Sequence, residues 1–151
     1  MREANFVKVQ LATGREILGD VIKVNSKRDV ALIKVEESKV MALPIKNGEL
    51  NIGNEVYAIG SPLAEDLKTS VSKGIISAYR VRDNLKYIQS DVTILPGSSG
   101  GPLLDENGNV VGVSVSNIIF LGTPSGINFF IPIQDALFAL NIKADLLWLD
   151  K

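Results

Sequence analysis

A short glycine-rich run in the second half of the chain contains two adjacent serines. It covers residues 96–102 and reads P-G-S-S-G-G-P. A nucleophilic serine needs an exposed Oγ and nearby donors for an oxyanion, and a tight glycine-rich turn supplies both. We therefore assign Ser99 as the candidate nucleophile, and the N–H groups of Gly97 and Ser99 as the candidate oxyanion hole.

The alternative interpretation of this run is a glycine-rich surface hairpin without chemistry, because short motifs also match by chance. Catalysis by a serine needs a general base as well, and the chain contains no histidine, which is the commonest base. The chain also lacks cysteine, so disulfides and thiolate metal sites are excluded. We expect neither a cofactor nor a bound metal.

The composition is that of an ordinary globular protein. The 151 residues correspond to one domain, and 46% of them are hydrophobic. Sixteen basic and 17 acidic residues give a net charge of -1, which does not support binding to nucleic acid. No apolar run is long enough for a membrane span, and the N-terminal residues lack the apolar core of a signal peptide.

The elements that must position the serine run are predicted to be short strands. Residues Phe6–Leu11 alternate between apolar and polar, the pattern of a half-buried strand, and Asn107-Gly108 is a strong hairpin signal. Many short strands with frequent turns predict an all-β barrel or sandwich. Helix signals are confined to Gln134–Leu140. Further strands are predicted over residues 16–24, 30–35, 55–59, 69–79, 85–89, 103–104, 110–115 and 126–133.

Six runs, taken in order along the chain, resemble trypsin-like serine peptidases of the bacterial Deg/Htr type. The resemblance extends over almost the whole chain and implies a double β-barrel with the active site in the cleft between the barrels. It implies a remnant of the first barrel over about residues 1–62, a second barrel over about 63–133, and a C-terminal helix or linker over about 134–151. The runs are VKVQLATGR (7–15), RDVALIKV (28–35), IGNEVYAIGSP (52–62), SKGIIS (72–77), PGSSGGPL (96–103) and GINFFIPI (126–133).

The resemblance also implies roles for single residues. Asp29 corresponds to the aspartate of the catalytic triad, which orients the histidine; taken alone, it reads as a residue that caps a turn. Because Thr93, at the implied floor of the specificity pocket, is not acidic, no preference for Arg or Lys is expected. The pocket for the side chain preceding the scissile bond is implied near Thr93, Val113, Ser114, Val115, Ser116 and Asn128.

Three residues depart from the family pattern near this site. Asn128 and Phe130 replace a glycine and an alanine, so we expect a narrowed or blocked pocket. Leu95 replaces an asparagine in a loop that switches its oxyanion hole in this family. We expect this loop to be collapsed or poorly ordered, with at most one of the two N–H groups facing the cleft and with Ser99 still accessible to solvent.

The missing histidine leaves two hypotheses open. In the family it lies upstream of the first strand, which falls at or before Met1 here. We expect the chain to be the C-terminal three quarters of a serine endopeptidase domain, which cleaves protein substrates by Ser-His-Asp acyl transfer with the histidine outside this chain. The alternative is an inactive pseudopeptidase that binds peptides by strand addition.

The implied partners are protein or peptide substrates, without nucleic acid and without a membrane span. A barrel that lacks its first strands leaves an unpaired sheet edge, so we also expect copies of the chain to associate into homo-oligomers. The resemblance suggests the bacterial cell envelope or periplasm as the location.

Overall fold

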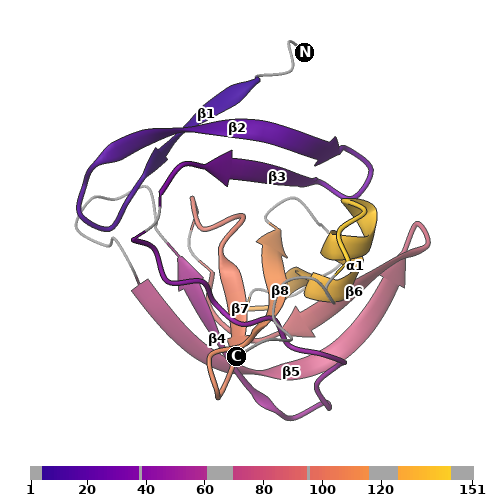
Figure 1. Cartoon of the computed structure of the whole chain (residues 1–151). Helices are drawn as coiled ribbons and strands as arrows, with labels where there is room; N and C mark the ends of the chain where they lie inside the picture. The colour runs from indigo at the N-terminus through magenta and orange to yellow at the C-terminus, as the bar shows by residue number, and fades with distance from the viewer. Residues whose placement is uncertain (1–4, 38, 61–69, 95, 116–125, 144–151) are drawn as a thin grey trace. The chain divides into compact units, whose positions relative to one another are not determined.

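The structure of the chain is a computed structural model, which describes residues 5–37, 39–60, 70–94, 96–115 and 126–143 (Figure 1). The described residues form two compact units. Of the described residues, those up to Ala42 and those at 137–143 form the first unit, and those within Leu43–Ala136 form the second. No helix within these described ranges is long and apolar enough to cross a membrane. The predicted partition near residues 62 and 133 stays a prediction.

The first unit contains a three-stranded antiparallel sheet in the order β1-β2-β3 (Figure 1). One face of this sheet is apolar: a Cβ on Gly19, in the middle strand, would lie 2.5 Å from Ile33 Cγ2 and 3.3 Å from Val9 Cγ2. Side chains from both outer strands therefore fill the space over Gly19. The strands are β1 (Phe6–Gln10), β2 (Glu16–Asn25) and β3 (Val30–Val35).

The only helix among the described residues is α1 (Ile133–Ala139), which follows the last strand directly. The last carbonyl groups of a helix have no partner within it. In the first unit, Lys23 Nζ donates to the carbonyl of Leu140 at 3.0 Å, and Asn25 Nδ2 donates to the carbonyl of Ala139 at 3.0 Å. The end of β2 thus satisfies the C-terminal end of α1.

The second unit is a closed antiparallel barrel of six strands in the order β4-β5-β6-β9-β8-β7 (Figure 1). Its interior includes the buried side chains of Val56, Ile76, Ile88, Leu103 and Phe130. The predicted all-β fold with a barrel and a short C-terminal helix is confirmed. The strands are β4 (Glu55–Gly60), β5 (Ser70–Arg82), β6 (Leu85–Ser90), β7 (Pro102–Asp105), β8 (Val110–Val115) and β9 (Asn128–Pro132).

Candidate active site

Ser99 lies on a tight turn that immediately precedes β7. The N–H of Gly101 donates to the carbonyl of Ser98 at 3.0 Å and closes a four-residue β-turn with Ser99 and Gly100 at its centre. Gly100 has a φ of 87°, and a positive φ at this third position is the requirement of a type II turn. Ser99 is exposed on the turn, which confirms the predicted accessibility.

Close contacts with the end of β4 explain why two positions near the turn are glycine. A Cβ on Gly101 would lie 2.4 Å from the carbonyl oxygen of Ile59. A Cβ on Gly60 would lie 2.1 Å from Ser98 Oγ. Real Cβ atoms do not approach other atoms this closely, so the serine turn packs against β4 only because both positions lack a side chain.

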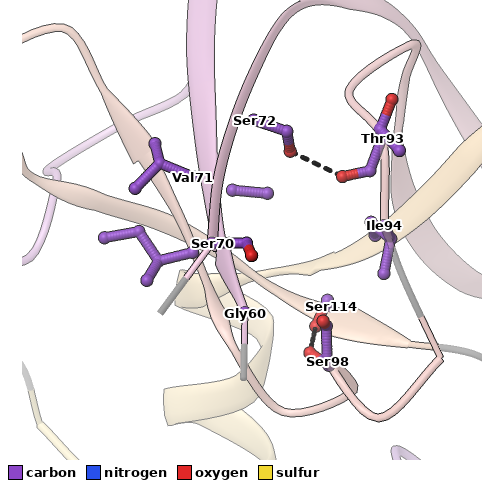
Figure 2. A pocket seen from close by; sticks show the side chains of 10 residues that line it. Gly60, Ser70, Val71, Ser72, Thr93, Ile94, Ser98 and Ser114 are labelled. Carbon is purple, nitrogen blue, oxygen red and sulfur yellow. Dashed lines mark hydrogen bonds between the residues drawn. The ribbon is translucent and has the colours of Figure 1, made fainter. Parts of the chain in front are cut away.

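The two serines of the turn have opposite environments. Ser98 is 8% exposed, and its carbonyl accepts a hydrogen bond from Ser114 Oγ on β8 at 2.5 Å (Figure 2). Two backbone bonds join the same strand to the turn: Ser114 N–H donates to Gly101 O at 2.9 Å, and Gly100 N–H donates to Ser114 O at 3.0 Å. One residue of β8 therefore holds the turn at three points and leaves Ser99 outside.

The segment that leads into the turn is fixed from two sides. Ser72 Oγ on β5 donates to the carbonyl of Thr93 at 2.5 Å (Figure 2). Asn128 Nδ2 on β9 donates to the carbonyl of Val92 at 2.8 Å. Asn128 thus contributes a structural hydrogen bond between β9 and this segment.

Asp91 fixes the start of the same segment, and the sequence analysis did not identify this contact. Its Oδ1 accepts a hydrogen bond from the N–H of Ile75 at 2.8 Å. A Cβ on Gly74 would lie 2.5 Å from that Oδ1 and 2.6 Å from the backbone nitrogen of Val92. Gly74 therefore permits the close approach, and the SKGIIS run is the sequence signal that could have indicated it.

A cavity of about 150 Å³ lies beside the turn (Figure 2). Ile59, Val71 and Ile94 contribute apolar walls, and serine and threonine hydroxyls contribute polar groups; the described lining contains no charged side chain. Of the six residues predicted for the substrate pocket, Thr93 and Ser114 line this cavity.

Three of the other residues predicted for the substrate pocket, Val113, Val115 and Asn128, are absent from the described lining of this cavity. Val113 and Val115 lie on β8, and Asn128 begins β9. Ser116 lies outside the described residues. The substrate-binding role of all six residues stays a prediction.

Asp29, the predicted triad aspartate, lies in the first unit, in the turn between β2 and β3. The N–H of Arg28 donates to Asn25 Oδ1 at 2.9 Å and shapes this turn. Asp29 itself has a φ of 61°, a left-handed conformation that aspartate tolerates better than most residues. Its side chain is exposed, and its role in a triad stays a prediction.

The candidate oxyanion donors are the N–H groups of Gly97 and Ser99. Gly97 has a φ of 94°, which a glycine adopts without strain. Neither N–H has an acceptor among the residues that the structure describes. Leu95 lies outside those residues, and the predicted collapse of the loop stays a prediction.

Comparison with known proteins identifies the family. The family model described as "Trypsin-like peptidase domain" matches residues 2–113. The chain belongs to this family. The trypsin-like peptidase domain is also similar in structure to the protein titled "HtrA-type protease AlgW with decapeptide", with a TM-score of 0.79, 29% identity, and coverage of 93% of this chain and 44% of that one.

Two curated relatives of this trypsin-like peptidase domain are named "probable periplasmic serine endoprotease DegP-like". The one from Halomonas elongata is 39% identical over 139 residues, which are 89% of this chain and 29% of the relative. The one from Chlamydia trachomatis is 36% identical over 138 residues, which are 87% of this chain and 27% of the relative. The predicted Deg/Htr relationship is confirmed, and the chain spans less than a third of these relatives' length.

Proposed function

We propose that this trypsin-like peptidase domain carries the nucleophile, the oxyanion donors and the aspartate of a serine endopeptidase that cleaves protein substrates. The observation that carries the proposal is the exposure of Ser99 on a turn braced by β4 and β8. The general-base histidine would come from outside this chain, which has none. The naming of relatives as periplasmic supports a periplasmic or envelope location.

In the proposed mechanism, Ser99 Oγ attacks the carbonyl carbon of the scissile peptide bond while the histidine takes its proton. The carbonyl oxygen becomes an oxyanion, which the N–H groups of Gly97 and Ser99 stabilise. The histidine then gives the proton to the leaving amine as the C–N bond breaks. Water, activated by the same histidine, hydrolyses the acyl-Ser99 ester, and Asp29 orients the imidazole throughout.

Extension of the chain tests this proposal. The segment of the Halomonas elongata relative that precedes its matched region is fused before residue 5, provided that it carries a histidine. The product is treated with a fluorophosphonate, which labels only an activated serine. We expect labelling of Ser99 and cleavage of casein by the extended chain. Both should disappear in Ser99→Ala and persist in Ser26→Ala, which removes an exposed serine from a turn of the first unit.

The decisive negative result is an extended chain that is folded but unreactive. If circular dichroism and a cooperative thermal transition show a folded product, and Ser99 is still not labelled, the endopeptidase proposal is wrong.

The absence of histidine from all 151 residues favours one second candidate, an inactive module that binds peptides. An extended peptide would add a strand to an open sheet edge. Calorimetric titration of the 151-residue chain with unstructured peptides tests it: saturable binding without cleavage supports the module, and no heat change up to millimolar peptide contradicts it.

A further inference from the structure

We propose that Ser114 is a positioning residue of the oxyanion hole, which acts through the carbonyl of Ser98 on the N–H of Ser99. The inference deepens the proposed function and rests on it, since the Ser99 N–H matters for catalysis only if Ser99 is the nucleophile. The structural part of the inference concerns the orientation of one peptide group and can be tested without catalysis.

The position of Ser114 in β8 is the first step. It is 5% exposed, between the half-buried Val113 and Val115, so its side chain points into the barrel rather than toward solvent. A buried hydroxyl needs a hydrogen-bond partner, because an unsatisfied one is costly. The partner of Ser114 is the carbonyl oxygen of Ser98, at 2.5 Å.

The geometry of the peptide group is the second step. The carbonyl and the N–H of one trans peptide unit point in opposite directions, and no cis peptide bond occurs in the described chain. The Ser98 carbonyl is directed at two donors, Ser114 Oγ and the N–H of Gly101. The N–H of Ser99 belongs to the same peptide unit and therefore points away from Ser114.

The need for an external anchor is the third step. Gly97 and Gly100 flank the two serines with φ values of 94° and 87°, and glycines let neighbouring peptide units rotate at low cost. A hydrogen bond of ordinary net strength changes the ratio of two backbone orientations by about tenfold. The Ser114 hydroxyl is thus sufficient to decide the orientation of the Ser99 N–H.

The cavity beside Ser114 makes a matched pair of variants feasible. Ser114 lines a space of about 150 Å³, which accommodates one additional methyl group. Ser114→Thr keeps the hydroxyl and adds that methyl. Ser114→Val has the same shape as the threonine variant but has a methyl in place of the hydroxyl, so the two variants differ only in the hydrogen bond to Ser98.

The first experiment uses amide NMR of the 151-residue chain and needs no activity. In Ser114→Thr, we expect the Ser99 and Gly101 amide signals to stay close to their original positions. In Ser114→Val, we expect both signals to move or split, and exchange of the Gly101 N–H to become about tenfold faster. If the folded valine variant leaves both signals unchanged, the inference is overturned. Should that variant not fold, Ser114→Ala is used instead.

The second experiment is kinetic and uses the histidine-extended chain. An oxyanion donor acts in the transition state, so its misplacement lowers kcat and not substrate affinity. Because the two variants have the same shape, we expect them to have equal KM and equal pH midpoints. We expect kcat to be about tenfold lower in Ser114→Val and to stay within about twofold of its original value in Ser114→Thr. An effect confined to KM, or equal losses in both variants, overturns the inference. If the extended chain shows no Ser99-dependent turnover, the proposed function has failed, and the NMR result still decides the orientation of the peptide.

Discussion

Ser98 and Ser99 are adjacent in the chain, but their hydroxyl groups have different environments and can have different roles. Ser98 is buried, with its Oγ directed at Gly60 and its carbonyl bonded to Ser114, so it belongs to the framework of the turn. Ser99 projects into solvent from the centre of the same turn. Exposure makes an oxygen accessible but does not make it nucleophilic, because a serine without a base is an ordinary alcohol.

We therefore expect no peptidase turnover from the 151-residue chain itself. Release of dye from labelled casein should be equal for the chain and for Ser99→Ala, at the background rate. Cleavage by the chain that is lost in Ser99→Ala would contradict this prediction.

Gly101 gives a second prediction at the residue scale. A Cβ there meets a backbone carbonyl oxygen at 2.4 Å, which cannot move without shifting β4. We expect Gly101→Ala to lower the free energy of unfolding by about 3 kcal/mol. The control is Gly48→Ala, where φ is 81° but the space is open, so only backbone strain of about 1 kcal/mol is expected. Urea unfolding of both variants measures the difference, and equal losses would contradict the steric explanation.

At the scale of the elements, the β7–β8 hairpin is organised by one buried carboxylate. Asp105 is 4% exposed, and its Oδ1 accepts from the N–H groups of Asn107 and Asn109, each at 2.9 Å. Burial by itself raises the pKa of Asp105, but the hydrogen bonds from Asn109 and Asn107, with the charge of Lys46, outweigh it and hold the pKa below its ordinary value.

This lowered pKa predicts a pH-dependent contribution to stability. A carboxyl group with a lower pKa in the folded chain stabilises the fold above its unfolded pKa, about 3.9, and loses this contribution as the pH falls through the folded pKa. We expect the difference in unfolding free energy between the chain and Asp105→Asn to be constant from pH 7 to about 4 and to shrink below that. Urea titrations at several pH values measure it.

The control for this prediction is Ser26→Ala, which changes an exposed residue without a carboxyl group and should show no such decrease. A difference for Asp105→Asn that stays constant down to pH 2 would contradict the prediction.

The sequence predicted individual strands better than their contacts. Alternation identified β1, and the Asn107-Gly108 signal identified the β7–β8 hairpin, because both are local patterns. The predicted end of β5 at Tyr79 was wrong: the strand continues to Arg82, which pairs with Leu85 across a tight hairpin. Its end depends on pairing with β6, which the composition of β5 does not encode.

In the candidate site, too, local sequence patterns were predicted and contacts between distant residues were not. The glycine pattern around Ser99 indicated the turn, because positive φ and close backbone contacts require glycine at particular positions. The bond from Ser114 to Ser98 was not predicted, since it depends on how β8 passes the turn. A polar residue at an inward position of an apolar strand was the available signal.

At the scale of the whole chain, the sheet of the first unit has an open edge. β1 pairs with β2, and no other described strand pairs with it. Its first residue, Phe6, is 62% exposed. An exposed edge strand with apolar side chains is a template for pairing with another chain.

We therefore expect the chain to associate with copies of itself as its concentration rises. Light scattering after size-exclusion chromatography, over a hundredfold range of concentration, should show an increasing mean mass. Phe6→Lys should reduce the increase, because charge on an edge strand opposes pairing. Phe138→Lys is the matched control, since Phe138 is 87% exposed but lies on α1. A constant monomer mass, or equal effects of both variants, would contradict edge pairing.

The contact between Gly60 and Ser98 also restricts how this chain can change by mutation. These two positions, far apart in the sequence, share a volume that admits one side chain, since a Cβ at residue 60 would lie 2.1 Å from Ser98 Oγ and 2.6 Å from Ser98 Cβ. A side chain at position 60 is tolerated only after position 98 has become glycine. A series of single mutations that ends with a side chain at position 60 and glycine at position 98 must therefore pass through a variant with glycine at both positions. That intermediate gives additional backbone freedom to the turn that carries Ser99, the proposed nucleophile.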